Sequence, residues 1–185
     1  MINIRYLTTG ELEAGLENIR QSPKDQGVLE MIVRRPQENE RETLVEGHLD
    51  LVLGLVGDNW RTRGSSRRPD KSAHPEMQIN VMNSRLIALI AQQKERWSLA
   101  GDQLYIDFDI SLENLPTGTR LAIGSAVIEV TPQSHTGCRK FLARFGEEAM
   151  KFVNSKVGKE LRLRGMNAKV IQPGTIHVQD VVTKV

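Results

Sequence analysis

Short segments rich in β-branched and aromatic residues, most of them closed by a Gly or Pro turn, run through this sequence. In the segment LYIDFDI, apolar residues alternate with polar ones, which places Leu104, Ile106, Phe108 and Ile110 on one face. Such alternation predicts a strand with one face toward the core. Two further segments, TRLAIGSAVIEVT and AKVIQPGTIHVQDVVTKV, each read as a strand pair around a Gly turn. Many short strands of this kind are typical of a β-barrel.

Helical patterns are few. Thr8 and Glu11 have capping-box spacing at the start of a short N-terminal helix. Asn83 or Ser84 is expected to cap a second helix, and Gly146 to divide the helical part GCRKFLARFGEEAMKFVNS. We therefore expect a mainly β fold with a few helices, built as a closed or near-closed β-barrel, in one domain over residues 1–185.

Composition excludes several classes of protein. No run approaches the roughly 18 apolar residues of a membrane span, and the early Glu11 and Glu13 do not fit a signal peptide. A single cysteine favours a reducing, cytoplasmic location. The net charge is only +2 and aromatic residues make up 4% of the chain, so nucleic-acid binding is not favoured.

The only cysteine, Cys138, follows a glycine and precedes two basic residues in SHTGCRKFLARFG. We expect Ser134 or Thr136 to cap the helix that follows, which puts Cys138 in its first turn. Free amides and the positive end of the helix dipole favour a thiolate there, and Arg139 and Lys140 add positive charge. A thiolate binds metal or attacks sulfur. The alternative is a buried cysteine that acts as a small hydrophobic residue.

The segment LPTGTRLAIGSAVIEVTPQSHTGCRKFLARFG resembles the signature of MOSC domains, modules found at the C-terminus of molybdenum cofactor sulfurases. LVLGLVGDNWRTR resembles the upstream Gly-x-x-Gly-Asp segment of that family, and RGMNAKVIQPGTIHVQDVV resembles its closing strands. The resemblance covers roughly residues 27–182 and leaves residues 1–26 as an N-terminal helical extension. LYIDFDIS departs from the family's Asn-rich Glu-Asn-Leu segment, and Gln179 stands where a Gly before Asp180 is common.

The resemblance implies a barrel like that of pyruvate kinase and a bound molybdenum cofactor, molybdopterin. It implies that Cys138 either carries sulfur as a persulfide or ligates molybdenum in the reduction of N-hydroxylated compounds. The chain shows no aminotransferase-like sulfurase part and no iron–sulfur cysteine cluster. We therefore expect it to act without pyridoxal phosphate and to receive sulfur or electrons from an external sulfur donor or electron-transfer protein.

Five more residues are candidates for an anionic-cofactor pocket around the cysteine: Asp58, Arg61, Arg63, His135 and Arg139. Asp58 would orient a cofactor amine or, alternatively, cap its own turn. Arg61 and Arg63 would grip a phosphate or the pterin, or belong to a solvated loop. We expect this basic loop, Arg61 to Lys71, to fold toward the cysteine. His135 would pair with the thiolate or be an exposed loop histidine.

Polar residues on the second face of LYIDFDI are Tyr105, Asp107 and Asp109. Paired carboxylates there would suit catalysis, but a solvated strand face explains them more simply, and we expect the latter.

Two classes of function remain. In one, the protein is a cofactor-dependent enzyme or a sulfur-transfer protein that uses Cys138. In the other, it is a non-catalytic carrier of a pterin cofactor or a protein-interaction module. An enzyme needs Cys138 open to a cleft, whereas a carrier tolerates a buried cysteine.

Overall fold

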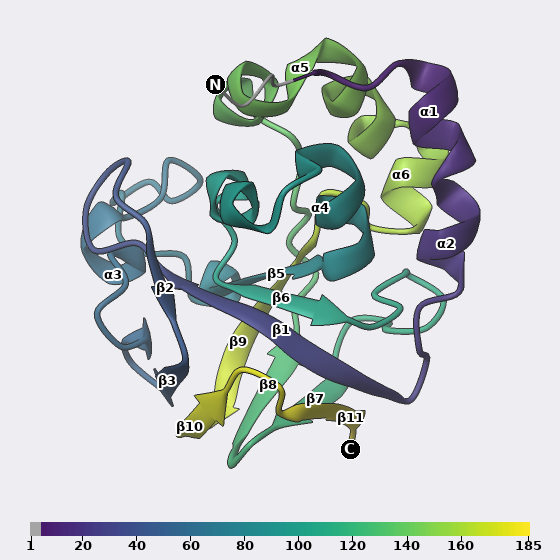
Figure 1. Ribbon diagram of the computed structural model, residues 1–185. Coiled ribbons are helices and arrows are strands. Elements are labelled where there is room, and N and C mark those ends of the chain that lie inside the picture. Colours follow the sequence, from purple (N-terminus) through teal and green to yellow (C-terminus); the bar gives the residue numbers. More distant parts are fainter. Residues whose placement is uncertain (1–4) are drawn as a thin grey trace.

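The computed structural model describes residues 5–185, and their strands wrap into a β-barrel (Figure 1). The chain closes seven strands within these residues in the order β1–β11–β7–β8–β9–β5–β6 and back to β1. All neighbours in this ring are antiparallel except β5 and β6. The mainly β, closed-barrel prediction is confirmed. The seven strands are β1 (Gln26–Arg34), β5 (Ile79–Asn83), β6 (Leu104–Asp107), β7 (Arg120–Ile123), β8 (Ala126–Val130), β9 (Met166–Gln172) and β11 (Val181–Lys184).

Four shorter strands lie outside the ring: β2 (Glu42–Leu44) extends the sheet from β1, and β10 (Gly174–His177), β3 (Glu46–Asp50) and β4 (Gly54–Leu55) form a separate sheet. The predicted strand pair around Pro173 and Gly174 is therefore wrong, because β9 and β10 join different sheets. At Gly174 the chain passes the turn between β7 and β8, where an added Cβ would lie 2.5 Å from the carbonyl carbon of Ser125. Thr175 N donates to Ser125 Oγ at 2.8 Å, which directs β10 toward β3.

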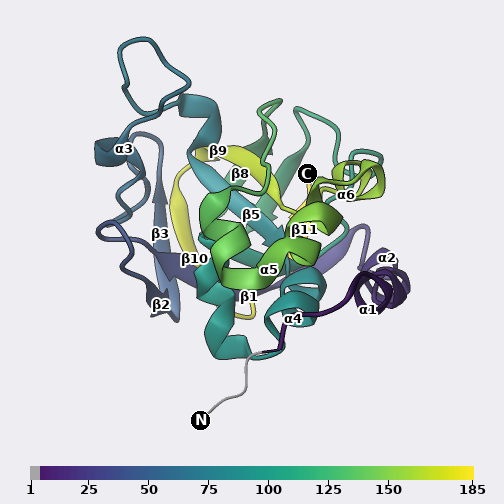
Figure 2. The ribbon, with the colours of Figure 1, turned by 90° about the horizontal axis from the view of Figure 1, so that it is seen from above.

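Most helices gather on one side of the barrel, whereas α3 lies apart beside β2 and β3 (Figure 1; Figure 2). The helices are α1 (Thr9–Ala14), α2 (Leu16–Arg20), α3 (Trp60–Arg63), α4 (Ser84–Ala91), α5 (Arg139–Asn154) and α6 (Lys156–Glu160), with 3₁₀ turns η1 (Pro75–Met77) and η2 (Lys94–Ala100). Across residues 5–185, no helix combines the length and apolarity of a membrane span.

Three helix signals read from the sequence are confirmed. Thr8 and Glu11 form the capping box of α1. Asn83 Oδ1 accepts from Leu86 N at 3.0 Å and caps α4. Gly146 has φ +87° and breaks α5 into two helical parts. The first of these two parts begins at the N-cap residue Cys138.

Strands β5 and β6 bury both of their faces. Leu104, Ile106 and Phe108 point into the barrel as expected, and all three are fully buried. Tyr105 on the opposite face is also fully buried, among side chains of α4, α5 and η2, and its hydroxyl donates to Trp97 O at 2.8 Å. The prediction of a solvated face at Tyr105 is therefore wrong, because the helical layer covers that part of the barrel.

Candidate functional site

A cavity of about 310 Å³ opens between the basic loop, the segment that carries Cys138 and the start of α5. Its lining residues, all within the described chain, include no aspartate or glutamate. Two histidines, His74 and His135, also line it. With so many fixed cations and no lining acid, the wall creates a positive potential suited to an anion. We call it the cationic cavity, and its basic side chains are Arg35, Arg41, Arg63, Arg67, Lys140, Arg144 and Arg164.

Cys138 is exposed and lies on the wall of this cavity. It is itself the N-cap residue of α5, and its carbonyl accepts from Leu142 N at 3.0 Å. The predicted caps, Ser134 and Thr136, therefore lie before the helix rather than at its start. Gly137 permits this arrangement, since an added Cβ there would lie 2.5 Å from Met150 Sδ. The thiol is accessible, which does not fit a purely hydrophobic role.

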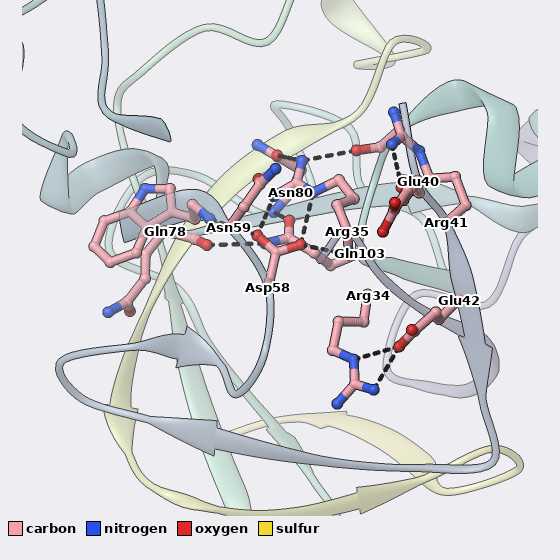
Figure 3. Close-up of polar contacts among 12 residues, drawn as sticks. Arg34, Arg35, Glu40, Arg41, Glu42, Asp58, Asn59, Gln78, Asn80 and Gln103 are labelled. Atoms are coloured by element: carbon pink, nitrogen blue, oxygen red, sulfur yellow. Dashed lines mark hydrogen bonds and ion pairs between the residues drawn. The ribbon is translucent and has the colours of Figure 1, made fainter. Parts of the chain in front are cut away.

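Asp58 is not on the cavity wall, but it pairs with Arg35, which is (Figure 3). Its carboxylate accepts from Arg35 Nε at 2.7 Å and Arg35 Nη2 at 2.8 Å, and neither side chain is more than 4% exposed. Backbone N–H groups of Arg35 and Trp60 donate to the same carboxylate at 3.0 and 2.9 Å. Arg35 Nη1 donates to Asn80 Oδ1 at 3.0 Å. Asp58 thus positions Arg35, and Arg35 reaches the cavity.

The two candidate arginines of α3 point to different places. Arg63 lines the cavity, whereas Arg61 donates to Val52 O at 3.1 Å and is not among the lining residues. Partial desolvation, and then the nearby guanidinium of Arg35, lower the pKa of Arg63 from its usual value. Desolvation and the charges of Arg144 and Arg35 lower the pKa of Arg41 in the same way. These arginines remain charged, so the wall holds cations that repel one another.

The basic loop and the cysteine segment meet at the cavity. Arg67 Nη1 donates to Ser134 O at 3.3 Å and to Gln133 Oε1 at 3.4 Å. The expected approach of the basic loop to Cys138 is therefore seen in the geometry. At the start of α5, Lys140 rather than Arg139 lines the cavity, and Lys140 Nζ also pairs with Glu38 Oε1 at 2.6 Å.

His135 lines the cavity, but it does not form the expected ion pair with the thiolate of Cys138. Its Nδ1 lies 3.3 Å from Oδ1 of the fully buried Asp102, whose Oδ2 accepts from Arg164 Nη1 at 2.7 Å. Burial, and then the guanidiniums of Arg164 and Arg35, hold the pKa of His135 well below its usual 6.5. The ring is therefore neutral near pH 7, and a neutral ring forms no ion pair with a thiolate.

Sequence reasoning missed four arginines of this wall, Arg35, Arg41, Arg144 and Arg164, and the buried Asp102 that contacts His135 and Arg164. They come from the loop after β1, the segment before β6, α5 and the segment before β9, and only the barrel brings them together. The local signal was weak: Arg35 precedes Pro36 and Arg164 precedes Gly165, where basic residues at strand ends carry no distinctive pattern.

Fold and site together define a β-barrel protein with a single exposed cysteine on the wall of a cavity lined by basic side chains. The family model of the MOSC domain matches residues 68–183, which is more than half of the chain, so this protein belongs to the MOSC domain family. That family is associated with the molybdenum cofactor. The match includes Cys138, His135 and Arg164 but not Arg35 or Asp58.

Solved structures share the fold. The chain is similar to YuaD from Bacillus subtilis, with 15% identity and a TM-score of 0.56 over 85% of this chain and 94% of that one. It is also similar to YiiM from Escherichia coli, with 20% identity and a TM-score of 0.53 over 85% of this chain and 69% of that one. It is similar as well to YiiM from Geobacillus stearothermophilus, with 13% identity and a TM-score of 0.51 over 86% of this chain and 75% of that one. No curated protein matches the sequence.

Proposed function

We propose that this protein binds the molybdenum cofactor in the cationic cavity and uses the sulfur of Cys138 as the protein's own ligand to molybdenum. The observation that carries the proposal is the position of an exposed Cys138 on a wall with seven basic side chains and no acidic one among the described lining residues. A thiolate among cations is a soft metal ligand, and the cations suit an anionic organic group.

The residues of the wall fit a phosphate-bearing cofactor. Guanidinium groups bind phosphate through paired, charge-assisted hydrogen bonds. Among residues 5–185, Arg41 and Arg164 each have a buried Nε without a hydrogen-bond partner. Arg63 and Arg67 form no ion pair with a carboxylate of the described chain, so their charge is available to a ligand. The cavity volume of about 310 Å³ lies at the lower end of the range for small-molecule sites.

In this proposal the earlier candidates divide into two groups. Arg63 and His135 belong to the wall, and Asp58 supports it through Arg35. Arg61 and Arg139 lie outside the wall and are left out of the binding set. The bound cofactor would supply a redox-active metal. Cys138 would hold it, and the arginines would orient it and offset its charge.

The reaction that fits best is reduction of an N-hydroxylated compound. Cleavage of the N–O bond takes two electrons and two protons and gives an N–H bond and water. We propose that an external electron-transfer protein supplies the electrons. Persulfide transfer from an external sulfur donor is the second candidate, since the same exposed thiol would carry the sulfur. A non-catalytic cofactor carrier would need the cavity but not the thiol.

The test is to purify the protein from cells that make the cofactor and to measure molybdenum, released pterin and any sulfur added to Cys138. We expect molybdenum and pterin in equal amounts, with molybdenum lost in Cys138→Ser and both lost in Arg63→Ala. Arg61→Ala is the matched control on the same helix and should retain both.

Each other result has a distinct meaning. Added sulfur on Cys138 without molybdenum supports persulfide transfer instead. Pterin and molybdenum retained by Cys138→Ser support the carrier. If the wild-type protein carries no molybdenum, no pterin and no added sulfur, the proposal is contradicted.

A further inference from the structure

His135 and Asp102 bring a ring nitrogen and a carboxylate oxygen face to face, and no other hydrogen bond determines which of these two atoms carries a proton. His135 Nδ1 and Asp102 Oδ1 are 3.3 Å apart, both atoms are buried, and neither has a hydrogen-bond partner among residues 5–185. Gly165 makes the approach possible. It has φ +110°, and an added Cβ would lie 3.1 Å from Nδ1 and 3.3 Å from Oδ1.

The contact is attractive only if one of the two atoms carries a proton. Asp102 Oδ2 already accepts from Arg164 Nη1 at 2.7 Å, and a guanidinium favours the ionised carboxylate. Burial raises the pKa of Asp102, and Arg164 opposes that rise. A carboxylate held by Arg164 leaves Nδ1 as the atom that must carry the proton, since two facing lone pairs would repel. A neutral imidazole carries a single ring proton, so a proton on Nδ1 leaves Nε2 without one.

The second ring nitrogen, Nε2, is then a free acceptor. It has no hydrogen-bond partner within residues 5–185, yet it is not among their buried unpartnered atoms, so water reaches it. His135 lines the cationic cavity. Two other acceptors of that wall are engaged, since Asn80 Oδ1 accepts from Arg35 Nη1 and His74 Nδ1 accepts from Glu76 N. Arginine and lysine side chains are donors only.

We propose that Asp102 holds His135 with its ring proton on Nδ1, and that the free Nε2 makes the cationic cavity prefer oxyanions that still carry a hydrogen, such as hydrogen phosphate, over oxyanions that carry none. The arginines attract both kinds of anion. Only a ligand with an O–H group satisfies Nε2, while an oxyanion without hydrogen presents a lone pair to it. The inference takes the cavity from the proposed function as its ligand site but requires neither molybdenum nor a persulfide.

The first test reads the tautomer directly. Nitrogen chemical shifts of the His135 ring, assigned by their loss in His135→Phe, are measured by NMR near neutral pH. We expect a protonated Nδ1 and an unprotonated Nε2. Asp102→Asn should shift the balance between the tautomers, whereas Asp107→Asn, a nearby aspartate that pairs with Arg85 outside the cavity, should not. If Nε2 carries the proton in the wild-type protein, the proposal is overturned, whether or not Asp102→Asn folds.

The second test compares phosphate with sulfate, which have the same shape but differ in their hydrogen. Near neutral pH we expect phosphate to bind the wild-type protein roughly threefold to tenfold more tightly than sulfate, the worth of one hydrogen bond. In His135→Phe, which keeps a ring but no acceptor, the difference should vanish. Equal binding by the wild-type protein, or a preference that survives in His135→Phe, would overturn the proposal.

Both tests separate this inference from the proposed function. A wild-type protein without molybdenum or pterin that still shows the tautomer and the preference for phosphate contradicts the proposed function and supports the inference. A protein that carries the cofactor but has the opposite tautomer contradicts the inference alone.

Discussion

Asp58 and Arg35 form a bidentate ion pair that is almost completely shielded from water, with N–O distances of 2.7 and 2.8 Å. Removing one partner of a buried pair leaves an uncompensated charge, which typically costs about 3–5 kcal/mol. We therefore expect Asp58→Ala to lower the free energy of unfolding by about that amount in urea denaturation. Asp107→Ala is the control, because its pair with Arg85 is about a quarter exposed. A pair that water partly reaches contributes less than a fully buried one, so an equal loss in both variants would argue against a structural role for Asp58.

The difference between Arg63 and Arg61 predicts which arginine of α3 binds anions. Arg63 lines the cavity and Arg61 does not. A charge-assisted hydrogen bond contributes about 1.5–3 kcal/mol, so Arg63→Ala should weaken pyrophosphate binding by roughly tenfold or more in calorimetry. Arg61→Ala should change the affinity by less than about threefold at moderate salt. A larger loss in Arg61→Ala would place the anion outside the cationic cavity.

Gly64 closes the basic loop, and its replacement should affect binding more than stability. It has φ +68°, and an added Cβ would lie 2.1 Å from Lys71 O. Gly118 also has positive φ, at +88°, but its Cβ would meet nothing within 4 Å. Both Gly→Ala variants should lose about 1–2 kcal/mol of stability from the left-handed backbone. Only Gly64→Ala should also lose pyrophosphate affinity, because the loop must move away from the cavity. Equal affinities would show that the loop contributes no contact.

Local patterns predicted most of the fold because they depend on near neighbours. The capping box of Thr8 and Glu11, the cap at Asn83 and the break at Gly146 all act within one or two helical turns. Pairing partners were harder to predict. Nothing near Gly174 in the chain indicates that β10 leaves β9 for β3, or that helices cover Tyr105. Both outcomes depend on contacts between distant segments.

Site residues could be predicted from the sequence where their residue type is rare in the chain, but not where it is common. A single cysteine before a helical pattern pointed to Cys138, which the structure places on the cavity wall. Arginines are numerous, and sequence could not separate Arg63 from Arg61. Asp102 gave no signal, because its importance comes from burial beside Arg164 and His135.

The titration of His135 should depend on whether an anion occupies the cavity. Burial and four guanidiniums, those of Arg164, Arg35, Arg67 and Arg63, hold the pKa of His135 well below 6.5. A bound sulfate would offset part of that positive field and raise the pKa, so sulfate binding should take up a proton. By linkage, sulfate affinity should then rise as pH falls below about 6.5, by at most tenfold per pH unit for a single group.

Calorimetry of sulfate binding between about pH 7.5 and 5.5 checks this sign. The variant His135→Phe provides the reference, and the wild-type curve should be steeper than that of the variant. Equal slopes would mean that another group takes up the proton.

Cys138 should react in the folded protein, and an anion in the cavity should protect it. The thiol is exposed and shares the cavity wall with Arg63, so a small alkylating reagent needs no denaturant to reach it. Pyrophosphate bound beside the thiol would block the access of the reagent to the sulfur. We expect alkylation, followed by mass spectrometry with Cys138→Ser as the blank, to slow as pyrophosphate is added. The protection should be weaker in Arg63→Ala and unchanged in Arg61→Ala. Labelling that requires denaturant would return Cys138 to a structural role, and labelling unaffected by pyrophosphate would separate the thiol from the anion site.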